Sequence, residues 1–215
     1  MLNIAVLVSG GGTNLQALID YEKQTGASAR GCPYHIVLVA SNTKRAYALE
    51  RAKAAGIPAE IRSPVQVLGP ALMSATMDEK RELVSDAMLD LCREHKADAI
   101  VLAGYLSVLK GSIIDAYKDR IINLHPALLP KFGGVGMWGH NVHEAVIEAG
   151  EKESGCTVHL VDSGCDTGRI LVQKRVPVLP GDTPDSLYAR IAPEEHKAIV
   201  EAVLMLAKQV AREAL

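Results

Sequence analysis

Two polar side chains stand close together in the apolar segment 122–126, which reads INLHP. Asn123 and His125 are two residues apart, and in an extended segment that spacing places both side chains on one side. The amide of Asn123 can donate hydrogen bonds, and the imidazole of His125 can exchange a proton near neutral pH. Such a pair can hold a developing oxyanion and move a proton, but a capped turn with one hydrogen-bonded histidine would contain the same residues.

A second polar segment, 162–168, reads DSGCDTG and separates two β-like stretches late in the chain. Aspartate and glycine are common in turns for purely local reasons. A carboxylate from this segment close to His125 would also orient the imidazole and raise its pKa. Separate loops of the chain could therefore supply an asparagine, a histidine and an aspartate to one pocket.

The third candidate site is the glycine-rich segment 9–14, SGGGTN, which follows the apolar run NIAVLV. Glycines allow close backbone approach, so that successive N–H groups at the start of a helix can face an anion, although any tight turn can also be glycine-rich. The GxGxxG dinucleotide fingerprint fails because residue 15 is leucine, and the second strand ends in Ser41-Asn42 without an acidic residue. No GxxxxGK[ST] motif is present either. A monophosphate is the ligand size that this loop favours.

Short apolar runs alternate with amphipathic stretches along the chain, which is typical of βα units around a mainly parallel sheet. The apolar runs predict strands at 3–8, 35–41, 58–62, 98–103 and 121–124. The amphipathic stretches predict helices at 14–21, 44–55 and 78–96, and segment 63–77 lacks periodicity, so we expect a loop there. Such a sheet would place Asn123 and His125 at the carboxyl end of a strand, where open α/β sheets bind ligands.

After residue 153 the sequence becomes rich in β-formers, in the stretches 154–162 and 169–178, and a final helix is expected over 183–213. The predicted fold is therefore α/β: a Rossmann-like, mainly parallel sheet extended by late antiparallel strands. No internal repeat, low-complexity tract or linker divides the chain. We expect a single domain over residues 1–215.

The composition excludes several classes of protein. The 215 residues include 48% hydrophobic ones, and 23 basic against 25 acidic side chains leave a formal net charge of −2. This balance argues against disorder and against a basic nucleic-acid-binding surface. The four cysteines show neither zinc nor disulfide spacing, no basic leader precedes the first strand, and no apolar segment is long enough to span a membrane. We therefore expect a soluble, cytoplasmic protein without a metal.

Longer segments carry a resemblance that runs in order over nearly the whole chain. They are VLVSGGGTNLQALI at the start, LAGYL at 102–106, INLHPALLPKF at 122–132, ESGCTVHLVDSGCDTGRIL at 153–171 and EEHKAIVEAV at 194–203. The chain resembles the folate-dependent phosphoribosylglycinamide formyltransferases. This resemblance implies direct transfer of a formyl group from 10-formyltetrahydrofolate to the amine of glycinamide ribonucleotide in de novo purine biosynthesis, without a metal or a covalent enzyme intermediate.

The resemblance also implies roles for individual residues. The catalytic residues would be Asn123, His125 and Asp166. The ribotide would be bound by Gly11, Gly12, Thr13, Asn14 and Glu195, and the folate by Arg81, Leu106, Ser107, Val108, Leu109, Val161 and Asp162. The ribotide phosphate would thus bind in a half of about 1–105, and the folate and the catalytic groups would belong to a half of about 106–215. The expected partners are these small molecules, with the chain as a monomer or homodimer.

Two departures from the family pattern stand out. Segment 131–143 is longer than the family's usual turn and contains four glycines, which predicts a mobile flap. Its His140 and His143 lack further ligands at zinc spacing, so capping and packing roles are expected. Ser107 stands where many relatives carry arginine, which puts a charge contact to folate from that position in doubt.

Other functions share part of this pattern. Methionyl-tRNA formyltransferase and formyltetrahydrofolate deformylase use the same Asn, His and Asp, but they carry extra domains that we do not expect here. A Rossmann oxidoreductase is disfavoured by the failed dinucleotide fingerprint. A ribotide-binding regulatory protein without activity would keep the glycine-rich loop and lose the catalytic residues, all of which are present.

Overall fold

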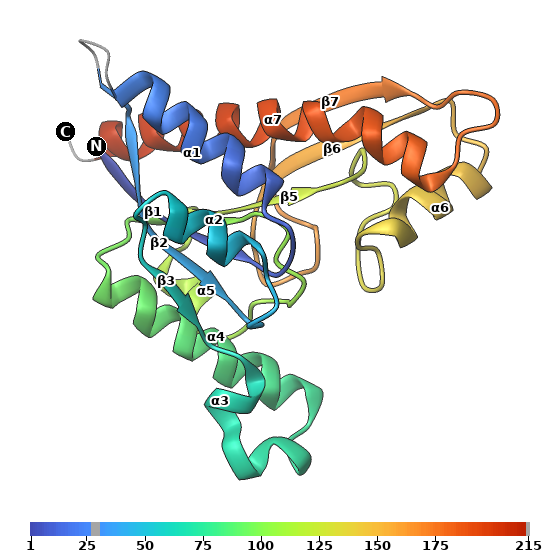
Figure 1. Ribbon diagram of the computed structural model, residues 1–215. Helices are drawn as coiled ribbons and strands as arrows, with labels where there is room; N and C mark the ends of the chain where they lie inside the picture. The colour runs from blue at the N-terminus through green and yellow to red at the C-terminus, as the bar shows by residue number, and fades with distance from the viewer. Residues whose placement is uncertain (27–30, 214–215) are drawn as a thin grey trace.

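The computed structural model describes residues 1–26 and 31–213 and consists of one seven-stranded sheet covered by helices on both faces (Figure 1). The strands are β1 (Leu2–Val8), β2 (Tyr34–Ser41), β3 (Ala59–Ile61), β4 (Ala99–Leu102), β5 (Ile121–His125), β6 (Glu153–Leu160) and β7 (Ile170–Pro177). The helices are α1 (Thr13–Gly26), α2 (Ala48–Ala54), α3 (Pro64–Leu68), the 3₁₀ helix η1 (Gly69–Met73), α4 (Met77–Glu94), α5 (Ser112–Ala116), α6 (His140–Glu148) and α7 (Pro184–Glu213). Residues 27–30 and 214–215, which fall within the predicted single domain, lie outside the described residues.

The order of the strands confirms the predicted α/β class. The sheet runs β3-β2-β1-β4-β5-β6-β7, and the five strands from β3 to β5 are parallel. β6 pairs antiparallel with β5, and β7 pairs antiparallel with β6, as the β-rich texture after residue 153 predicted. Because β1 and β4 lie in the middle of the sheet, both of their faces are buried, which explains their nearly continuous apolar sequences.

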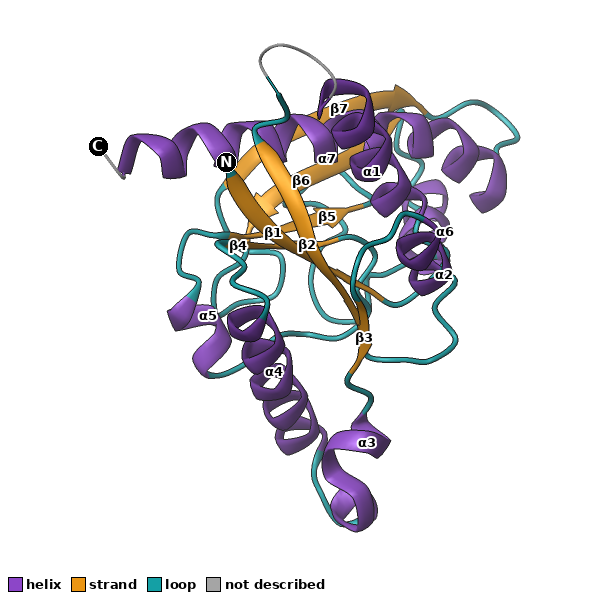
Figure 2. Ribbon diagram, turned by 60° about the vertical axis from the view of Figure 1, so that its left-hand side comes forward, coloured by secondary structure: helices purple, strands orange, loops and turns teal. Residues whose placement is uncertain are grey.

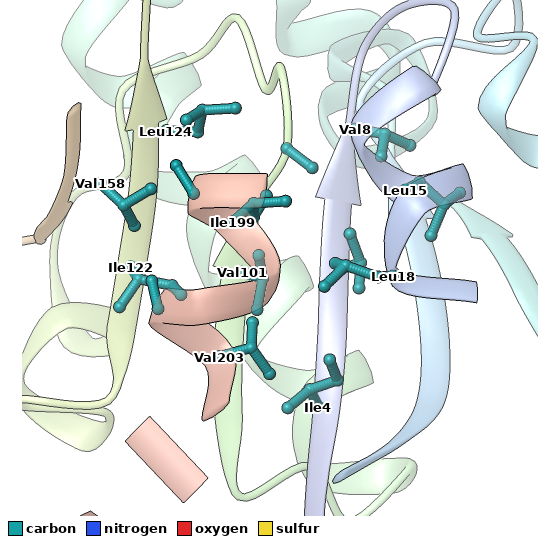
Figure 3. Packing of buried hydrophobic residues seen from close by; sticks show 14 of the residues in the cluster. Ile4, Val8, Leu15, Leu18, Val101, Ile122, Leu124, Val158, Ile199 and Val203 are labelled. Carbon is teal, nitrogen blue, oxygen red and sulfur yellow. The ribbon is translucent and has the colours of Figure 1, made fainter. Parts of the chain in front are cut away.

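Alternation along β1 divides the core into two layers. Ile4 and Val8 contribute to the larger layer, which packs under α1, α2 and α7, and Leu7 contributes to the layer under α4 and α5. Figure 2 shows α1 and α7 on one side of the sheet and α4 and α5 on the other. In the larger layer, Ile199 of α7 and Leu15 of α1 are fully buried (Figure 3). The layers hold the strand ends rigidly.

The predicted loop over 63–77 is wrong for most of its length. Residues 64–68 form α3 and residues 69–73 form η1. Ser63 caps α3: its hydroxyl accepts a hydrogen bond from the Gln66 backbone N–H, and the Gln66 side chain accepts one from the Ser63 N–H. This capping box and Pro64 at the first helical position stabilise a helix that is too short to show a 3.6-residue period.

Other element boundaries differ from the prediction, and two further helices, α5 and α6, were not predicted. The helix expected from residue 44 begins at Ala48, because Ser41 and Thr43 hydrogen-bond to each other and form a turn after β2. α5 and α6 lie in segments for which the sequence predicted no element. No helix of the described residues is long and apolar enough to cross a membrane.

Candidate active site

One cleft of about 810 Å³ opens along the carboxyl ends of the parallel strands. The segments that follow β1, β4 and β5 line it, together with residues from α4, α6 and α7. Every site residue expected from the sequence lines this cleft: Gly11, Gly12, Thr13, Asn14, Arg81, Leu106, Ser107, Val108, Leu109, Asn123, His125, Val161, Asp162, Asp166 and Glu195. The fold thus brings together residues that lie up to 184 positions apart, from Gly11 to Glu195.

Asn123, His125 and Asp166 form one contact group in the middle of the cleft. Asn123 and His125 end β5, and Asp166 belongs to the turn between β6 and β7. Asn123 Nδ2 lies 3.4 Å from Asp166 Oδ1, and His125 Nδ1 lies 3.5 Å from Asp166 Oδ2. The backbone N–H of Gly134 donates to Asp166 Oδ2 over 2.9 Å, which fixes the carboxylate. One carboxylate therefore contacts the amide, the imidazole and the flap.

The tautomers of the two buried histidines follow from their backbone contacts. His125 Nε2 lies 2.7 Å from the Phe132 carbonyl oxygen, which can only accept, so Nε2 carries a hydrogen. The other ring nitrogen, Nδ1, faces Asp166 and carries no hydrogen when the ring is neutral. His159 Nδ1 lies 2.8 Å from the Leu160 carbonyl oxygen and carries a hydrogen for the same reason, which leaves Nε2 as an acceptor.

His159 belongs to this contact group although the sequence did not single it out. It is 2% exposed, stands opposite Asn123 in the β5–β6 register, and its Nε2 lies 3.1 Å from Asn123 Nδ2. The same Nε2 lies 3.4 Å from Asp166 Oδ1. One hydrogen of the Asn123 amide is therefore directed at His159. A polar residue in an otherwise buried strand, SGCTVHL, was the available signal.

Burial and hydrogen bonding together set the charge states of His125 and Asp166. Burial lowers the pKa of His125 below its ordinary value, and the opposing effects of Asp166 and the Phe132 carbonyl are smaller. As expected, Asp166 alone acts to raise the pKa of His125. The overall pKa of His125 is nevertheless lowered, against the expectation, because the effect of burial is larger. Burial acts to raise the pKa of Asp166, but the contact with His159 and the hydrogen bond from the Gly134 N–H outweigh it and lower that pKa. The resting pair is therefore a neutral imidazole beside an ionised carboxylate.

The glycine-rich loop closes one end of the cleft. No described residue accepts a hydrogen bond from the backbone N–H groups of Gly11, Gly12 or Thr13, and α1 begins at Thr13. These N–H groups and the positive end of the α1 dipole make this end of the cleft suited to an anion.

Glu195 of α7 reaches the same end of the cleft. Asn14 Nδ2 donates to Glu195 Oε2 over 3.1 Å, and Asn14 Oδ1 is buried without a partner among the described residues. Burial raises the pKa of Glu195, and the Asn14 hydrogen bond opposes that rise. A buried carboxylate beside an unused amide oxygen is suited to hydroxyl groups, because hydroxyls can donate to both.

Apolar side chains form the opposite wall. Leu106 is 58% exposed, whereas Leu109 is 4% exposed and anchors the segment in the core. Arg81 lies inside α4, one turn after its start, with Nη1 3.6 Å from Asp78 Oδ1. Asp162 closes its own turn, since its Oδ1 accepts from the Gly164 N–H over 2.9 Å and from the Thr167 hydroxyl over 2.6 Å. This wall combines an open apolar surface with two flanking cations, Lys80 and Arg81.

The flap predicted over 131–143 is too long, because residues 140–143 belong to α6; the loop of residues 133–139 remains as the flap. The expected capping role of His140 is wrong: α6 is capped by Gly139 without a side-chain hydrogen bond, and His140 Nε2 instead lies 3.5 Å from Asp185 Oδ1. His143 is 2% exposed and packs its ring 5.7 Å from that of Tyr188, which matches the expected packing role. In the part of the chain that the structure describes, no three His, Cys, Asp or Glu side chains are arranged to hold a metal ion.

Comparisons of the sequence relate this chain to known proteins. A sequence profile of the formyl transferase family matches residues 2–203. The chain is 45% identical over 206 residues to the trifunctional purine biosynthetic protein adenosine-3 of Drosophila melanogaster, which covers 94% of this chain and 14% of that protein. It is 40% identical over 205 residues to the chloroplastic phosphoribosylglycinamide formyltransferase of Arabidopsis thaliana, which covers 93% of this chain and 63% of that protein. The chain therefore spans less than two thirds of either relative.

Solved structures match over nearly the whole chain. Glycinamide ribonucleotide transformylase 1 of Symbiobacterium toebii has a TM-score of 0.83 at 36% identity and covers 97% of this chain and 89% of that chain. Phosphoribosylglycinamide formyltransferase of Brucella melitensis has a TM-score of 0.79 at 38% identity and covers 96% of this chain and 95% of that chain.

Proposed function

This chain belongs to the formyl transferase family, and we propose that it transfers the formyl group of 10-formyltetrahydrofolate to the amine of glycinamide ribonucleotide. The products are formylglycinamide ribonucleotide and tetrahydrofolate, and the reaction belongs to de novo purine biosynthesis. One observation carries the proposal: a single cleft joins an anion-binding loop to the contact group of Asn123, His125 and Asp166. A phosphorylated acceptor bound at the loop would present its far end to that group.

Both substrates fit the two ends of the cleft. The free N–H groups of Gly11, Gly12 and Thr13 are suited to the phosphate, and Asn14 and Glu195 are suited to the ribose hydroxyls. The folate would lie along Leu106, Ser107, Val108, Leu109, Val161 and Asp162, with Arg81 near its acidic end. A cleft of about 810 Å³ is within the size range typical of small-molecule sites.

Asn123 would supply the hydrogen bond to the formyl oxygen. One hydrogen of its Nδ2 is held by His159 over 3.1 Å, and the other faces Asp166 over a weaker 3.4 Å contact. The weakly held hydrogen turns to the oxyanion that develops as the amine attacks the formyl carbon. Removal of one such donor typically slows a reaction by about 10² to 10³.

His125 and Asp166 would handle the proton that the attacking amine releases. 10-Formyltetrahydrofolate supplies the formyl carbon, and its N10 nitrogen is the leaving group. Nε2 of His125 already donates its hydrogen to the Phe132 carbonyl, so the proton from the amine binds at Nδ1. It reaches Nδ1 through Asp166, whose carboxylate faces that nitrogen. The imidazolium places positive charge beside the oxyanion and then returns the proton to N10, so the pair regains its starting state.

The proposal extends to the organisation of the molecule. Residues 1–215 form a single formyltransferase domain, with the ribotide phosphate bound by the half of about 1–105 and the folate by the half of about 106–215. The protein acts on these two small molecules without a metal, as a monomer or homodimer, in the cytoplasm.

The test is a formyl-transfer assay that follows the absorbance of the deformylated folate. We expect the deformylated folate to form only when glycinamide ribonucleotide is present. Formation of the deformylated folate without the ribotide would indicate the hydrolytic deformylase reaction instead. If no deformylated folate forms with or without the ribotide, but the ribotide binds tightly, the chain would be a binding protein without activity.

A further inference from the structure

Helix α2 lies beside the glycine-rich loop (Figure 1), and none of its residues lines the cleft. The backbone N–H of Ala48 donates to the Gly10 carbonyl oxygen over 3.1 Å. The Nε of Arg51 donates to the Gly11 carbonyl oxygen over 2.8 Å, and its Nη1 donates to Gln16 Oε1 in the first turns of α1 over 3.0 Å. Two consecutive carbonyls of the loop are thus bound by one helix.

These bonds fix the direction of the N–H groups. In a trans peptide the C=O and N–H bonds point in opposite directions. When Arg51 binds the Gly11 carbonyl, the N–H of Gly12 must point away from α2. The contact is close as well: a Cβ on Gly12, whose φ is +74°, would lie 2.6 Å from Ala48 Cβ and 3.4 Å from Arg51 Cδ. No side chain other than hydrogen fits between the loop and α2.

Arg51 also brings a positive charge to the back of the loop. Segment 9–14 contains no lysine or arginine, and the Lys and Arg side chains that line the cleft, Lys80 and Arg81, belong to α4. Among the described residues, no carboxylate lies within salt-bridge distance of Arg51; its guanidinium lies 5.3 Å from the ring centre of Tyr47. Arg51 would therefore place a positive charge that no carboxylate pairs next to a phosphate on the loop.

We propose that Arg51 is a positioning residue for the ribotide phosphate: it aims the Gly12 N–H into the cleft and offsets the charge of the phosphate from behind the loop. Arg51 does not line the cleft, so it acts through the loop rather than by contact with the ligand. This inference rests on the proposed function, because it assigns Arg51 to the phosphate of the acceptor substrate.

The test compares Arg51→Met, Arg51→Lys and the control Lys53→Met. Lys53 is a second cation of α2, but it is 61% exposed and pairs with Glu50 over 2.8 Å on the solvent side. For Arg51→Met we expect the KM for the ribotide to rise about tenfold, the value of a lost charged hydrogen bond, while kcat and the KM for folate stay within about twofold. Arg51→Lys should restore part of the loss, and Lys53→Met should resemble the wild type.

A role in fold stability alone would give a different pattern. We therefore measure kcat/KM for the ribotide and for the riboside that lacks the phosphate. Arg51→Met should lower kcat/KM for the ribotide and leave kcat/KM for the riboside unchanged. Equal losses for both acceptors, or an unchanged ribotide KM, would overturn the proposal.

Direct binding separates this test from the proposed reaction. Calorimetric titration with ribose 5-phosphate needs no formyl transfer, and we expect about tenfold weaker binding by Arg51→Met than by the wild type and Lys53→Met. Equal affinity in all three proteins would overturn the role of Arg51. A wild type that binds ribose 5-phosphate but transfers no formyl group would contradict only the proposed function.

Discussion

At the residue scale, the proposed function assigns the chemistry to Asn123, His125 and Asp166. Their alanine variants should lose most turnover, with kcat lower by about 10² or more for each, because each removes an oxyanion donor or the proton relay. Ribotide binding should stay largely intact, since the glycine-rich loop is untouched. Steady-state kinetics and ribotide titration check both halves of the prediction. Ser163→Ala, an exposed change in the same turn as Asp166, is the control. Wild-type turnover in His125→Ala would contradict the assignment.

The charge balance around His125 gives a second prediction at this scale. Burial lowers the pKa of His125, and Asp166 partly offsets that effect. Asp166→Asn removes the negative charge, so the pKa of His125 should fall further. An NMR pH titration of the imidazole C–H signals measures the change, with Ser163→Ala as the reference. A higher pKa in Asp166→Asn would show that the carboxylate does not stabilise the imidazolium.

The sequence predicted Asn123 and His125 because two-residue spacing at the end of a strand is a local property. It could not identify Asp166 without a family resemblance, since two aspartates of one turn look alike. The structure distinguishes them: Asp162 is bound within its own turn, and Asp166 faces β5. His159 was missed because its position opposite Asn123 depends on the β5–β6 register, which no local pattern encodes.

At the element scale, the predicted strands were correct to within one or two residues, because buried parallel strands give continuous apolar runs. The short helices were not predicted, because they are too short to show a helical period: α3 is stabilised by a capping box, and α5 has only five residues. The position of α2 behind the glycine-rich loop was also beyond the sequence, since it depends on contacts between residues about 40 positions apart.

The β6–β7 hairpin provides the element-scale prediction. A Cβ on Gly155 would lie 1.9 Å from the Lys174 carbonyl oxygen of the neighbouring strand. Gly155→Ala must therefore push β7 away from β6, and we expect a loss of about 3 kcal/mol or more in the free energy of unfolding. Urea denaturation measures it. Gly26→Ala, where a Cβ meets nothing within 4 Å, is the control; equal stability of the two variants would contradict the tight strand contact.

At the scale of the whole molecule, buried histidines couple stability to pH. Burial, with the nearby charges of His140 and His125, lowers the pKa of His143 to about 4. Between about pH 6.5 and pH 4 the unfolded chain therefore binds a proton at this residue that the folded chain does not, so stability falls as the pH falls. From pH 6.5 to pH 5 this single group should cost about 1.5 kcal/mol.

His143→Gln should remove that part of the pH dependence. Denaturant unfolding at pH 6.5 and pH 5 gives the difference for each protein, and the difference should be smaller in His143→Gln than in the wild type. His95→Gln, a change at the residue that follows α4, serves as the reference. Equal pH dependence in all three proteins would show that folding does not lower the pKa of His143.

Residues from both halves of the chain line one cleft, and the proposed function requires that the formyl group pass directly between two substrates bound there. The most direct measurement follows 10-formyltetrahydrofolate labelled with ¹³C in the formyl group by NMR. With glycinamide ribonucleotide present, we expect all of the label on the ribotide amine and none in formate, and no loss of label from the folate without the ribotide. Label that appears as free formate in either mixture would contradict direct transfer.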